Sequence, residues 1–231
     1  MFVRQLFDAT SSTYTYLLAD RAAGVAALVD PVRDQVDRDL SQLHELGLTL
    51  TYVLDTHVHA DHVTAAAVLR ERTGAGTCAS VRGAACASQH LRHGDVLRLG
   101  EIAITVLATP GHTDDSLSFL IPGAVFTGDA LLIRGCGRTD FQNGDPGVLY
   151  DSITGTLFTL PDATVVYPAH DYRGRSWSTI AEEKQWNPRL AGQDRDQFIA
   201  IMAELGLPPP AQLATAVPAN QACGALPAHG A

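Results

Sequence analysis

The chain has 231 residues, a length that fits one domain or one domain with an appendage. Hydrophobic residues make up 46% and charged residues 18%, which excludes a disordered chain and suits a globular enzyme. The formal net charge of −9 argues against nucleic acid as the main partner, because phosphate binding requires a basic surface. We therefore expect a soluble, acidic enzyme.

Membrane and export signals are not expected in this sequence. The apolar runs are short and are interrupted by Asp, Gly or Pro, so no segment is predicted to span a membrane. The N-terminal residues lack the long apolar core and cleavage site of a signal peptide. The cysteines have no CxxC spacing, and we interpret all four as reduced thiols: Cys78, Cys86, Cys136 and Cys223. These features predict a cytoplasmic protein.

The first third of the chain predicts three strands, a helix and a fourth strand. Strands are expected over residues 2–7, 14–19, 25–29 and 50–54, and a helix over residues 36–46. The helix has apolar residues at helical spacing, and Gly47 ends it. The strand at 50–54 leads directly into a histidine-rich loop, after which residues 64–72 are expected to form a second helix.

The rest of the chain alternates in the same way. Strands are expected over residues 102–107, 116–121, 124–126 and 165–167, and helices over residues 146–158, 179–185 and 194–205. After three consecutive prolines at 208–210, the sequence is rich in Ala and Pro and has no periodicity. We therefore predict a catalytic domain over residues 1–207 and an irregular C-terminal tail over residues 208–231.

Side chains that can bind a metal directly follow four of the predicted strands. Loops at the ends of packed strands can bring distant side chains to one point. Crowded imidazoles repel one another when protonated, and a cation that binds neutral imidazole and ionised carboxylate removes this repulsion. We expect a metal site built from His57, His59, Asp61, His62, His112, Asp129 and His170. For Asp61 alone, capping of the following helix is an alternative role.

The motifs at these positions resemble those of the metallo-β-lactamase superfamily. They read THVHADH, PGHT, TGDALL and YPAHDY, and the resemblance extends from about Phe2 to Leu205. It implies an α/β fold, the four-layer αββα sandwich, with a metal at one edge of the paired sheets. Membership of a superfamily does not define the reaction, because one fold supports many chemistries.

A narrower resemblance comes from the segment that reads GCGRTDF and ends at Phe141, which is similar to the persulfide dioxygenases. Asp171-Tyr172 and the residues from Glu182 to Arg189 also resemble that family. The resemblance implies one Fe(II) per chain, held by two imidazoles and one carboxylate as in non-haem iron oxygenases. The implied iron ligands are His57, His112 and Asp129. The residues implied to orient them and to hydrogen-bond water are His59, Asp61, His62 and His170.

The same resemblance implies that glutathione persulfide and O2 are converted, with water, to sulfite and glutathione. The outer sulfur rises from oxidation state about zero to four while O2 accepts four electrons, so no external reductant is needed. Arg138 is the candidate ligand for a glutathione carboxylate, because a guanidinium binds a carboxylate bidentately, and Tyr172 is the second candidate contact. A structural salt bridge is the alternative for Arg138. Cys136 is interpreted as either a buried small side chain or a thiol near the substrate. A homodimer is also suggested.

Two other functions remain open from the sequence. A glyoxalase II-like hydrolase would use Asp61, His62, Asp129 and His170 for a second metal, which would activate a bridging water against a thioester. Against it, glyoxalase II carries a long helical C-terminal domain, whereas the chain after His170 is short and ends in a Pro-rich segment. A non-catalytic persulfide or metal sensor would need a partner-binding domain, which the sequence does not suggest.

Overall fold

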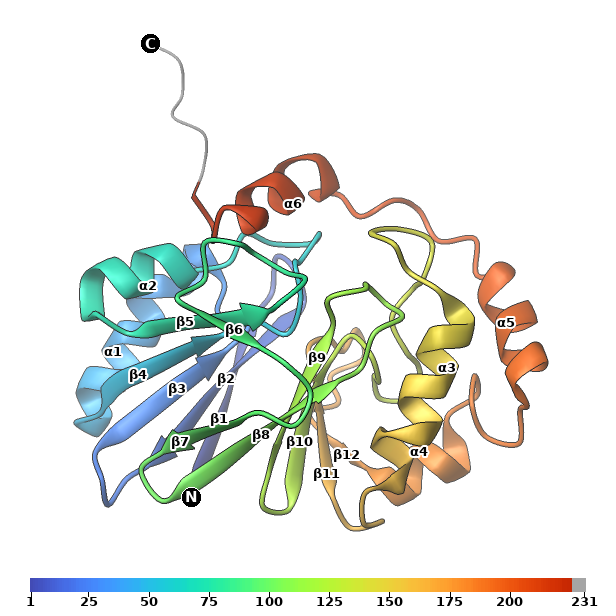
Figure 1. Cartoon of the computed structure of the whole chain (residues 1–231), viewed down its shortest axis with the longest axis horizontal. Helices are drawn as coiled ribbons and strands as arrows, with labels where there is room; N and C mark the ends of the chain where they lie inside the picture. Colours follow the sequence, from blue (N-terminus) through green and yellow to red (C-terminus); the bar gives the residue numbers. More distant parts are fainter. Residues whose placement is uncertain (226–231) are drawn as a thin grey trace. The chain divides into compact units, whose positions relative to one another are not determined.

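Two mixed six-stranded sheets form the frame of the fold, which a computed structural model describes for residues 1–225 (Figure 1). The chain forms two units. The first contains residues 1–91, residues 98–102 and the C-terminal segment from Pro209, and the second contains residues 92–97 and 103–208. Each unit has its own hydrophobic core.

The first sheet combines antiparallel neighbours with parallel ones. Its elements are β1 (Phe2–Asp8), β2 (Thr13–Asp20), β3 (Val25–Val29), η1 (Arg33–Gln35), α1 (Val36–Leu46), β4 (Thr49–Leu54), α2 (Ala66–Thr73), β5 (Gly76–Ser80) and β6 (Gln89–Leu91). The strand order is β1-β2-β3-β4-β5-β6, antiparallel up to β3 and parallel from β3 onward. Parallel neighbours require a crossover, and α1 and α2 supply two of these connections.

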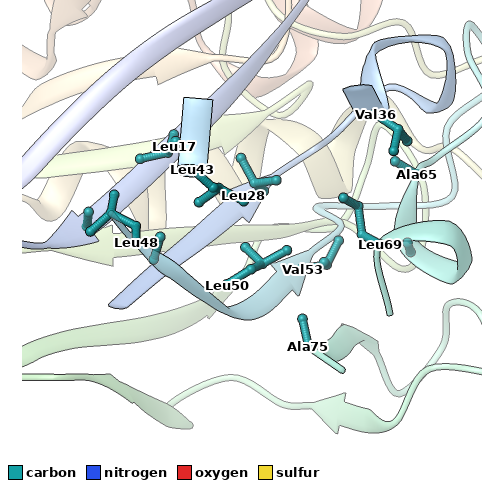
Figure 2. Close-up of a cluster of buried hydrophobic side chains, with 13 residues drawn as sticks. Leu17, Leu28, Val36, Leu43, Leu48, Leu50, Val53, Ala65, Leu69 and Ala75 are labelled. Atoms are coloured by element: carbon teal, nitrogen blue, oxygen red, sulfur yellow. The ribbon is translucent and has the colours of Figure 1, made fainter. Parts of the chain in front are cut away.

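The helices α1 and α2 bury their apolar residues against the first sheet (Figure 2). Leu43 of α1 and Leu69 of α2 belong to one buried cluster with Leu28 of β3 and Val53 of β4. Gly47 ends α1 with φ of 64°, a left-handed conformation that glycine adopts without strain. The chain therefore turns directly into β4, which carries the histidine-rich loop at its end.

The second sheet is also mixed. Its strands are β7 (Val96–Leu99), β8 (Ile102–Ala108), β9 (Leu117–Ile121), β10 (Ala124–Gly128), β11 (Val165–Pro168) and β12 (Ser178–Thr179), and the helices of the second unit are α3 (Pro146–Gly155), η2 (Leu157–Thr159), α4 (Ile180–Trp186) and α5 (Arg195–Ala203). The strand order is β12-β11-β10-β9-β8-β7, and β10 and β11 are parallel. Leu149 of α3 and Phe198 of α5 lie in a buried cluster with Val125 of β10 and Val166 of β11.

The strands and helices predicted from the sequence are confirmed within a few residues at their ends. Four further strands, β5, β6, β7 and β12, were not predicted from the sequence. These strands are short, and β5 consists of Gly, Thr, Cys, Ala and Ser, which carry little apolar pattern. β5 forms a strand because it pairs with β4 on one side and with β6 on the other. Its position therefore depends on tertiary contacts and not on a local sequence pattern.

The prediction of an irregular C-terminal tail is wrong for the described residues, because α6 (Leu213–Gln221) lies within it. The face that α6 buries consists of Ala216, Ala219 and Asn220, and such small side chains give almost no hydrophobic periodicity. Alanine is nevertheless the strongest helix former. Residues 226–231 of the predicted tail lie outside the described part of the chain.

The prediction of four reduced cysteines is also wrong, because Cys86 and Cys223 form a disulfide bond. Their Cα atoms are 6.0 Å apart although 137 positions separate them in the sequence, so no local spacing could reveal the pair. Cys78 and Cys136 are free and buried, and burial raises the pKa of the Cys78 thiol to about 12. Among the described residues, no helix is both long and apolar enough to cross a membrane.

Candidate metal centre

The loop after β4 gathers three histidines and an aspartate in the first unit. The ring centroids of His57 and His59 are 4.1 Å apart, and those of His59 and His62 are 4.3 Å apart. One ligand atom each from His59, Asp61 and His62 lies within 4.8 Å of the others. The three histidines are buried, so charging them together would be costly without a compensating partner. Neutral imidazoles beside a bound cation resolve this cost.

Asp30, which was not predicted as a site residue, organises this loop from the end of β3. Its carboxylate accepts hydrogen bonds from the Thr56 amide at 2.7 Å and from the Thr56 hydroxyl at 2.9 Å. It also lies 3.1 Å from Nε2 of His59. Asp30 has φ of 49°, a strained conformation for an aspartate that these bonds stabilise. The sequence feature that could have indicated Asp30 is the Asp30-Pro31 pair at the end of β3, the strand that pairs with β4.

Hydrogen bonding determines which ring nitrogen of His57 can accept a cation. Nδ1 of His57 lies 3.0 Å from the Thr56 hydroxyl oxygen. Because the single hydroxyl hydrogen of Thr56 goes to Asp30, the hydroxyl accepts from Nδ1–H of His57. The neutral ring is therefore unprotonated at Nε2, which makes Nε2 the nitrogen suited to a metal.

The other histidines of the loop have similar carboxylate partners. Nε2 of His59 donates to Asp30, so the unprotonated nitrogen of neutral His59 is Nδ1. Nδ1 of His62 donates to Asp61 at 2.8 Å, and the Thr13 hydroxyl donates to the same Asp61 oxygen at 3.0 Å. Asp61 thus orients His62, a role that differs from simple capping of α2. The N-cap of α2 is Ala65, so the alternative of Asp61 as N-cap is not met.

The second unit supplies another group of side chains at three strand ends. His112 follows β8, Asp129 follows β10, and His170 follows β11. Nε2 of His112 lies 3.5 Å from one carboxylate oxygen of Asp129, and Nε2 of His170 lies 3.7 Å from the other. These separations exceed those of good hydrogen bonds and suit side chains that share a cation. Imidazole and carboxylate are also donors that Fe(II) accepts.

The segment that reads GCGRTDF supports His112 and Asp129 directly. Nδ1 of His112 donates to the backbone carbonyl of Arg138 at 2.7 Å, which leaves Nε2 of the neutral ring unprotonated. The Gly137 amide donates to the carbonyl of Asp129 at 2.7 Å. A Cβ atom at Gly137 would lie 2.4 Å from that carbonyl oxygen and 2.7 Å from Nδ1 of His112, so only glycine fits. The motif therefore shapes the site through its backbone.

The segment from Glu182 to Arg189 holds that loop in place. The buried Glu183 carboxylate accepts from the Arg134 amide at 2.8 Å and from the Asn187 amide group at 2.9 Å. Asn187 also donates to the carbonyl of Gly135 at 2.9 Å, and Arg189 donates to the carbonyl of Cys136 at 2.6 Å. Two of the three sequence segments that resemble the persulfide dioxygenases, GCGRTDF and the residues from Glu182 to Arg189, thus form one structural assembly.

The guanidinium of Arg138 is engaged within the second unit. It forms a bidentate pair with Asp140, with distances of 2.6 and 2.7 Å, and donates to the carbonyls of Leu207 and Pro208. At least four of its five N–H groups are used in this way. These contacts match the alternative role of Arg138 as part of a structural salt bridge. A contact between Arg138 and a substrate carboxylate stays a prediction.

Tyr172 and Cys136 differ sharply in exposure. The Tyr172 side chain is 74% exposed and stacks on His170, with ring centroids 5.9 Å apart and planes 9° apart. This position suits a contact with an incoming molecule. Cys136 is buried against Met202, and burial raises the pKa of its thiol. Its geometry matches a buried small side chain rather than a reactive thiol.

The comparison with known proteins defines the family of this chain. Residues 9–85 and 89–170 match the family described as the metallo-beta-lactamase superfamily. The chain is 47% identical to mitochondrial persulfide dioxygenase ETHE1 of Mus musculus, a match that covers 97% of this chain and 89% of that protein. It is 62% identical to the chain in the crystal structure of ETHE1 from Myxococcus xanthus, with a TM-score of 0.96. This match covers 97% of the present chain and 100% of the Myxococcus xanthus chain.

The chain belongs to the persulfide dioxygenase family of the metallo-β-lactamase superfamily. The predicted α/β fold class and the predicted enzyme class, an oxidoreductase, are thereby confirmed. A hydroxyacylglutathione hydrolase from Bradyrhizobium sp. (strain ORS 278) is 41% identical over 174 residues, which cover 73% of this chain and 66% of the hydrolase. The likeness to the hydrolase is therefore partial, whereas the persulfide dioxygenases match almost the whole chain. Family and donor residues together support metal binding.

Proposed function

We propose that this chain is an Fe(II)-dependent dioxygenase that converts glutathione persulfide, O2 and water to glutathione and sulfite. The observation that carries the proposal is the match to a persulfide dioxygenase. This match covers 97% of this chain and 89% of that protein. The supporting assembly of the GCGRTDF segment and the Glu182 to Arg189 segment agrees with it, because it presents His112 and Asp129 through backbone contacts.

The proposed iron ligands are His57, His112 and Asp129. The donor chemistry fits Fe(II), because Nδ1 of His57 and Nδ1 of His112 each donate to an oxygen and leave Nε2 unprotonated. Two imidazoles and one carboxylate leave coordination positions for substrates, and the iron, when bound, would supply a template and a path for electrons. One iron per chain is part of this proposal.

The residues around the proposed ligands are proposed to orient those ligands and to exchange protons with bound water. His59 is held by Asp30, and His62 by Asp61, so neither imidazole can rotate without breaking a bond to a carboxylate. These rings and His170 would hydrogen-bond water near the reacting sulfur. Tyr172 is the proposed contact for the glutathione part of the substrate, because it is exposed and stacked on His170.

The reaction balances without any further reactant. Glutathione persulfide, O2 and water give glutathione, sulfite and two protons. The outer sulfur loses four electrons and O2 gains four. The S–S bond breaks, the thiol leaves with one proton, and the oxygen atoms of sulfite derive from O2 and water.

Metal analysis combined with oxygen uptake tests the function. Protein purified without oxygen should contain one iron per chain and should consume one O2 for each sulfite formed from glutathione persulfide. The hydrolase alternative predicts two metal ions per chain and hydrolysis of S-lactoylglutathione without oxygen uptake. That result would overturn the proposal.

Oligomeric state and location stay predictions. The family resemblance suggests a homodimer, which sedimentation measurements can test. The cytoplasmic location predicted from the sequence would disfavour the disulfide bond between Cys86 and Cys223, because disulfides are uncommon in reducing compartments.

A further inference from the structure

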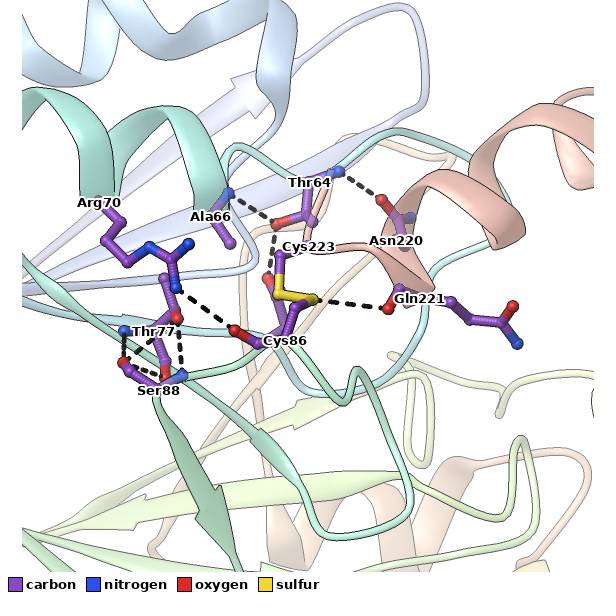
Figure 3. The surroundings of a disulfide bond; sticks show 10 residues. Thr64, Ala66, Arg70, Thr77, Cys86, Ser88, Asn220, Gln221 and Cys223 are labelled. Carbon is purple, nitrogen blue, oxygen red and sulfur yellow. Dashed lines mark hydrogen bonds between the residues drawn. A yellow bond between two sulfur atoms is a disulfide. The ribbon is translucent and has the colours of Figure 1, made fainter. Parts of the chain in front are cut away.

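The C-terminal segment contacts the histidine-rich loop of the first unit through one buried side chain, Asn220 at the end of α6 (Figure 3). Its Nδ2 group donates to the carbonyl of His59 at 2.9 Å and to the carbonyl of His62 at 2.8 Å. Its Oδ1 atom accepts from the amide of Thr64 at 2.8 Å. Both hydrogens of the amide group and its oxygen are therefore directed at the backbone of the loop.

These three bonds fix the loop between His59 and Thr64. Buried carbonyls need donors, and the donors here come from a single planar group that cannot change one bond without moving the others. The peptide groups that Asn220 holds set the directions of the side chains of His59, Asp61 and His62. The loop conformation thus depends on a residue more than 150 positions away in the sequence.

The residues after Asn220 anchor it to the first unit. Cys223 is bonded to Cys86, and its carbonyl accepts from the amide of Ala67 at 2.9 Å. Gly224 follows with φ of 82°, and a Cβ atom there would lie 2.1 Å from the carbonyl oxygen of Thr64, so only glycine permits this approach. Arg33 donates to the carbonyl of Gly224. We name Asn220, Cys223 and Gly224 the C-terminal clasp.

We propose that Asn220 is a positioning residue for the histidine-rich loop and that the Cys86–Cys223 bond keeps the C-terminal clasp in place. The inference rests on the proposed function only in taking this loop to present a metal ligand. All three hydrogen bonds of the Asn220 side chain go to backbone groups of the loop, so we assign Asn220 no direct contact with metal or substrate.

The variant Asn220→Asp tests the proposal, because it keeps the size of the side chain and removes both donors. Gln221→Ala is the matched control, since Gln221 is the next residue and its side chain is exposed and points away from the loop (Figure 3). Hydrogen exchange of the peptide over residues 57–64 in metal-free protein reports the loop. Titration with Fe(II), and in parallel with Zn(II), reports metal affinity.

We expect Asn220→Asp to speed exchange of the loop peptide and to weaken metal binding by about tenfold, the loss typical when support of a ligand is removed. Gln221→Ala should match the wild type in both measurements. Unchanged metal affinity, or a lower melting temperature without a change in affinity, would overturn the proposal. If Asn220→Asp does not fold, Asn220→Ser is measured against the same criteria.

The two metals separate this inference from the proposed function. Wild-type protein that binds Zn(II) but shows no iron-dependent oxygen uptake would refute the dioxygenase, while the Zn(II) titration would still test the clasp. For the disulfide, Cys86→Ser should shift loop exchange and metal affinity in the same direction as Asn220→Asp, and Ala85→Ser should not. If Cys86→Ser behaves as the wild type, the bond has no part in positioning the loop.

Discussion

At the residue scale, the partner of one ring nitrogen decides what the other nitrogen of a histidine can do. Nδ1 of His112 donates to the Arg138 carbonyl, which can only accept, and Nδ1 of His57 donates to a hydroxyl whose hydrogen is committed to Asp30. Both neutral rings are therefore unprotonated at Nε2 before any cation arrives. Motif spacing could predict the histidines, but it could not predict their tautomers, because the partners come from distant segments.

Removing a proposed ligand should remove the iron. We expect His112→Ala and Asp129→Asn each to weaken Fe(II) binding by at least about 100-fold, the upper end of the effect of disturbing a ligand's partner. Persulfide oxidation should fall with the iron content. Metal analysis and oxygen uptake on the same samples check this, and His90→Ala is the control because His90 is exposed on β6. Full iron occupancy in either variant would remove that residue from the ligand set.

Arg138 allows two predictions to be separated. Because its guanidinium is bonded to Asp140 and to two backbone carbonyls, we expect Arg138→Ala to lower the free energy of unfolding by about 1–2 kcal/mol. Asp140→Asn should also lower the free energy of unfolding. If the pair is only structural, the two variants should change the KM for glutathione persulfide to a similar extent. If Arg138→Ala alone raises KM while both variants keep their iron, Arg138 binds the substrate carboxylate as the sequence suggested.

The Arg138–Asp140 pair should also depend on pH. The hydrogen bond from Arg138 lowers the pKa of Asp140 below its usual value of 3.8. A lowered pKa in the folded state contributes stability above about pH 4 and loses it as the pH falls through the folded-state value. The stability difference between wild type and Asp140→Asn should therefore be present at pH 7 and shrink below pH 4. Unfolding curves across this range measure it, and a constant difference would contradict the ionic role.

At the scale of elements, patterned apolar residues made helices and strands predictable, whereas small side chains did not. Leu43 and its neighbours on α1 recur at helical spacing, and Gly47 marks the end of the helix. In α6 the buried face is Ala216, Ala219 and Asn220, which carries no such signal. The missed element is nevertheless the one that carries Asn220. Apolar periodicity identifies elements that bury large apolar side chains. An element such as α6, which contributes mainly hydrogen bonds, is not detected by this pattern.

Asp39 on α1 is a buried charge that no function explains. Its side chain is fully buried, and burial raises its pKa from 3.8 to about 6, although Arg38 beside it opposes the shift. A raised pKa in the folded state means that stability falls as the pH rises from about 4 to 6, because the unfolded chain ionises more easily. Asp39→Asn should therefore stabilise the protein at pH 7.5 by about 2 kcal/mol.

Urea unfolding at pH 4.5 and pH 7.5 checks the Asp39 prediction. The gain from Asp39→Asn should be largest at pH 7.5 and should decrease towards pH 4. Asp37→Asn is the control, because Asp37 lies on the same helix and its side chain is 90% exposed. A variant no more stable than the wild type at pH 7.5 would show that Arg38 compensates the buried carboxylate.

At the scale of the whole molecule, four of the candidate metal ligands could be selected from the sequence because each comes shortly after an apolar strand. β4 precedes His57, β8 precedes His112, β10 precedes Asp129, and β11 precedes His170. The supporting residues were not predictable as such, since Asp30, Glu183 and Asn220 act across long sequence separations. The family resemblance identified the supporting segments, and the structure explains their contacts.

The division of the chain into a catalytic domain of residues 1–207 and a tail leads to the last prediction. The structure places the described residues from Pro209 on within the first unit, where Asn220 bonds to the histidine-rich loop and Cys223 bonds to Cys86. A chain that ends at Pro208 should therefore lose these contacts, melt at a lower temperature and bind Fe(II) more weakly. It would still keep the carbonyls of Leu207 and Pro208 that accept from Arg138, so the second unit is undisturbed by the cut.

A chain that ends at Ala225 is the matched control for this truncation, because it retains the C-terminal clasp. We expect it to match the full chain in thermal stability and in iron content, and we expect the chain that ends at Pro208 to show at least the loss seen for Asn220→Asp. Thermal melts and metal analysis of the three chains decide the matter. If the chain that ends at Pro208 binds iron as tightly as the full chain, residues 1–207 are a self-sufficient catalytic domain, as the sequence alone predicted.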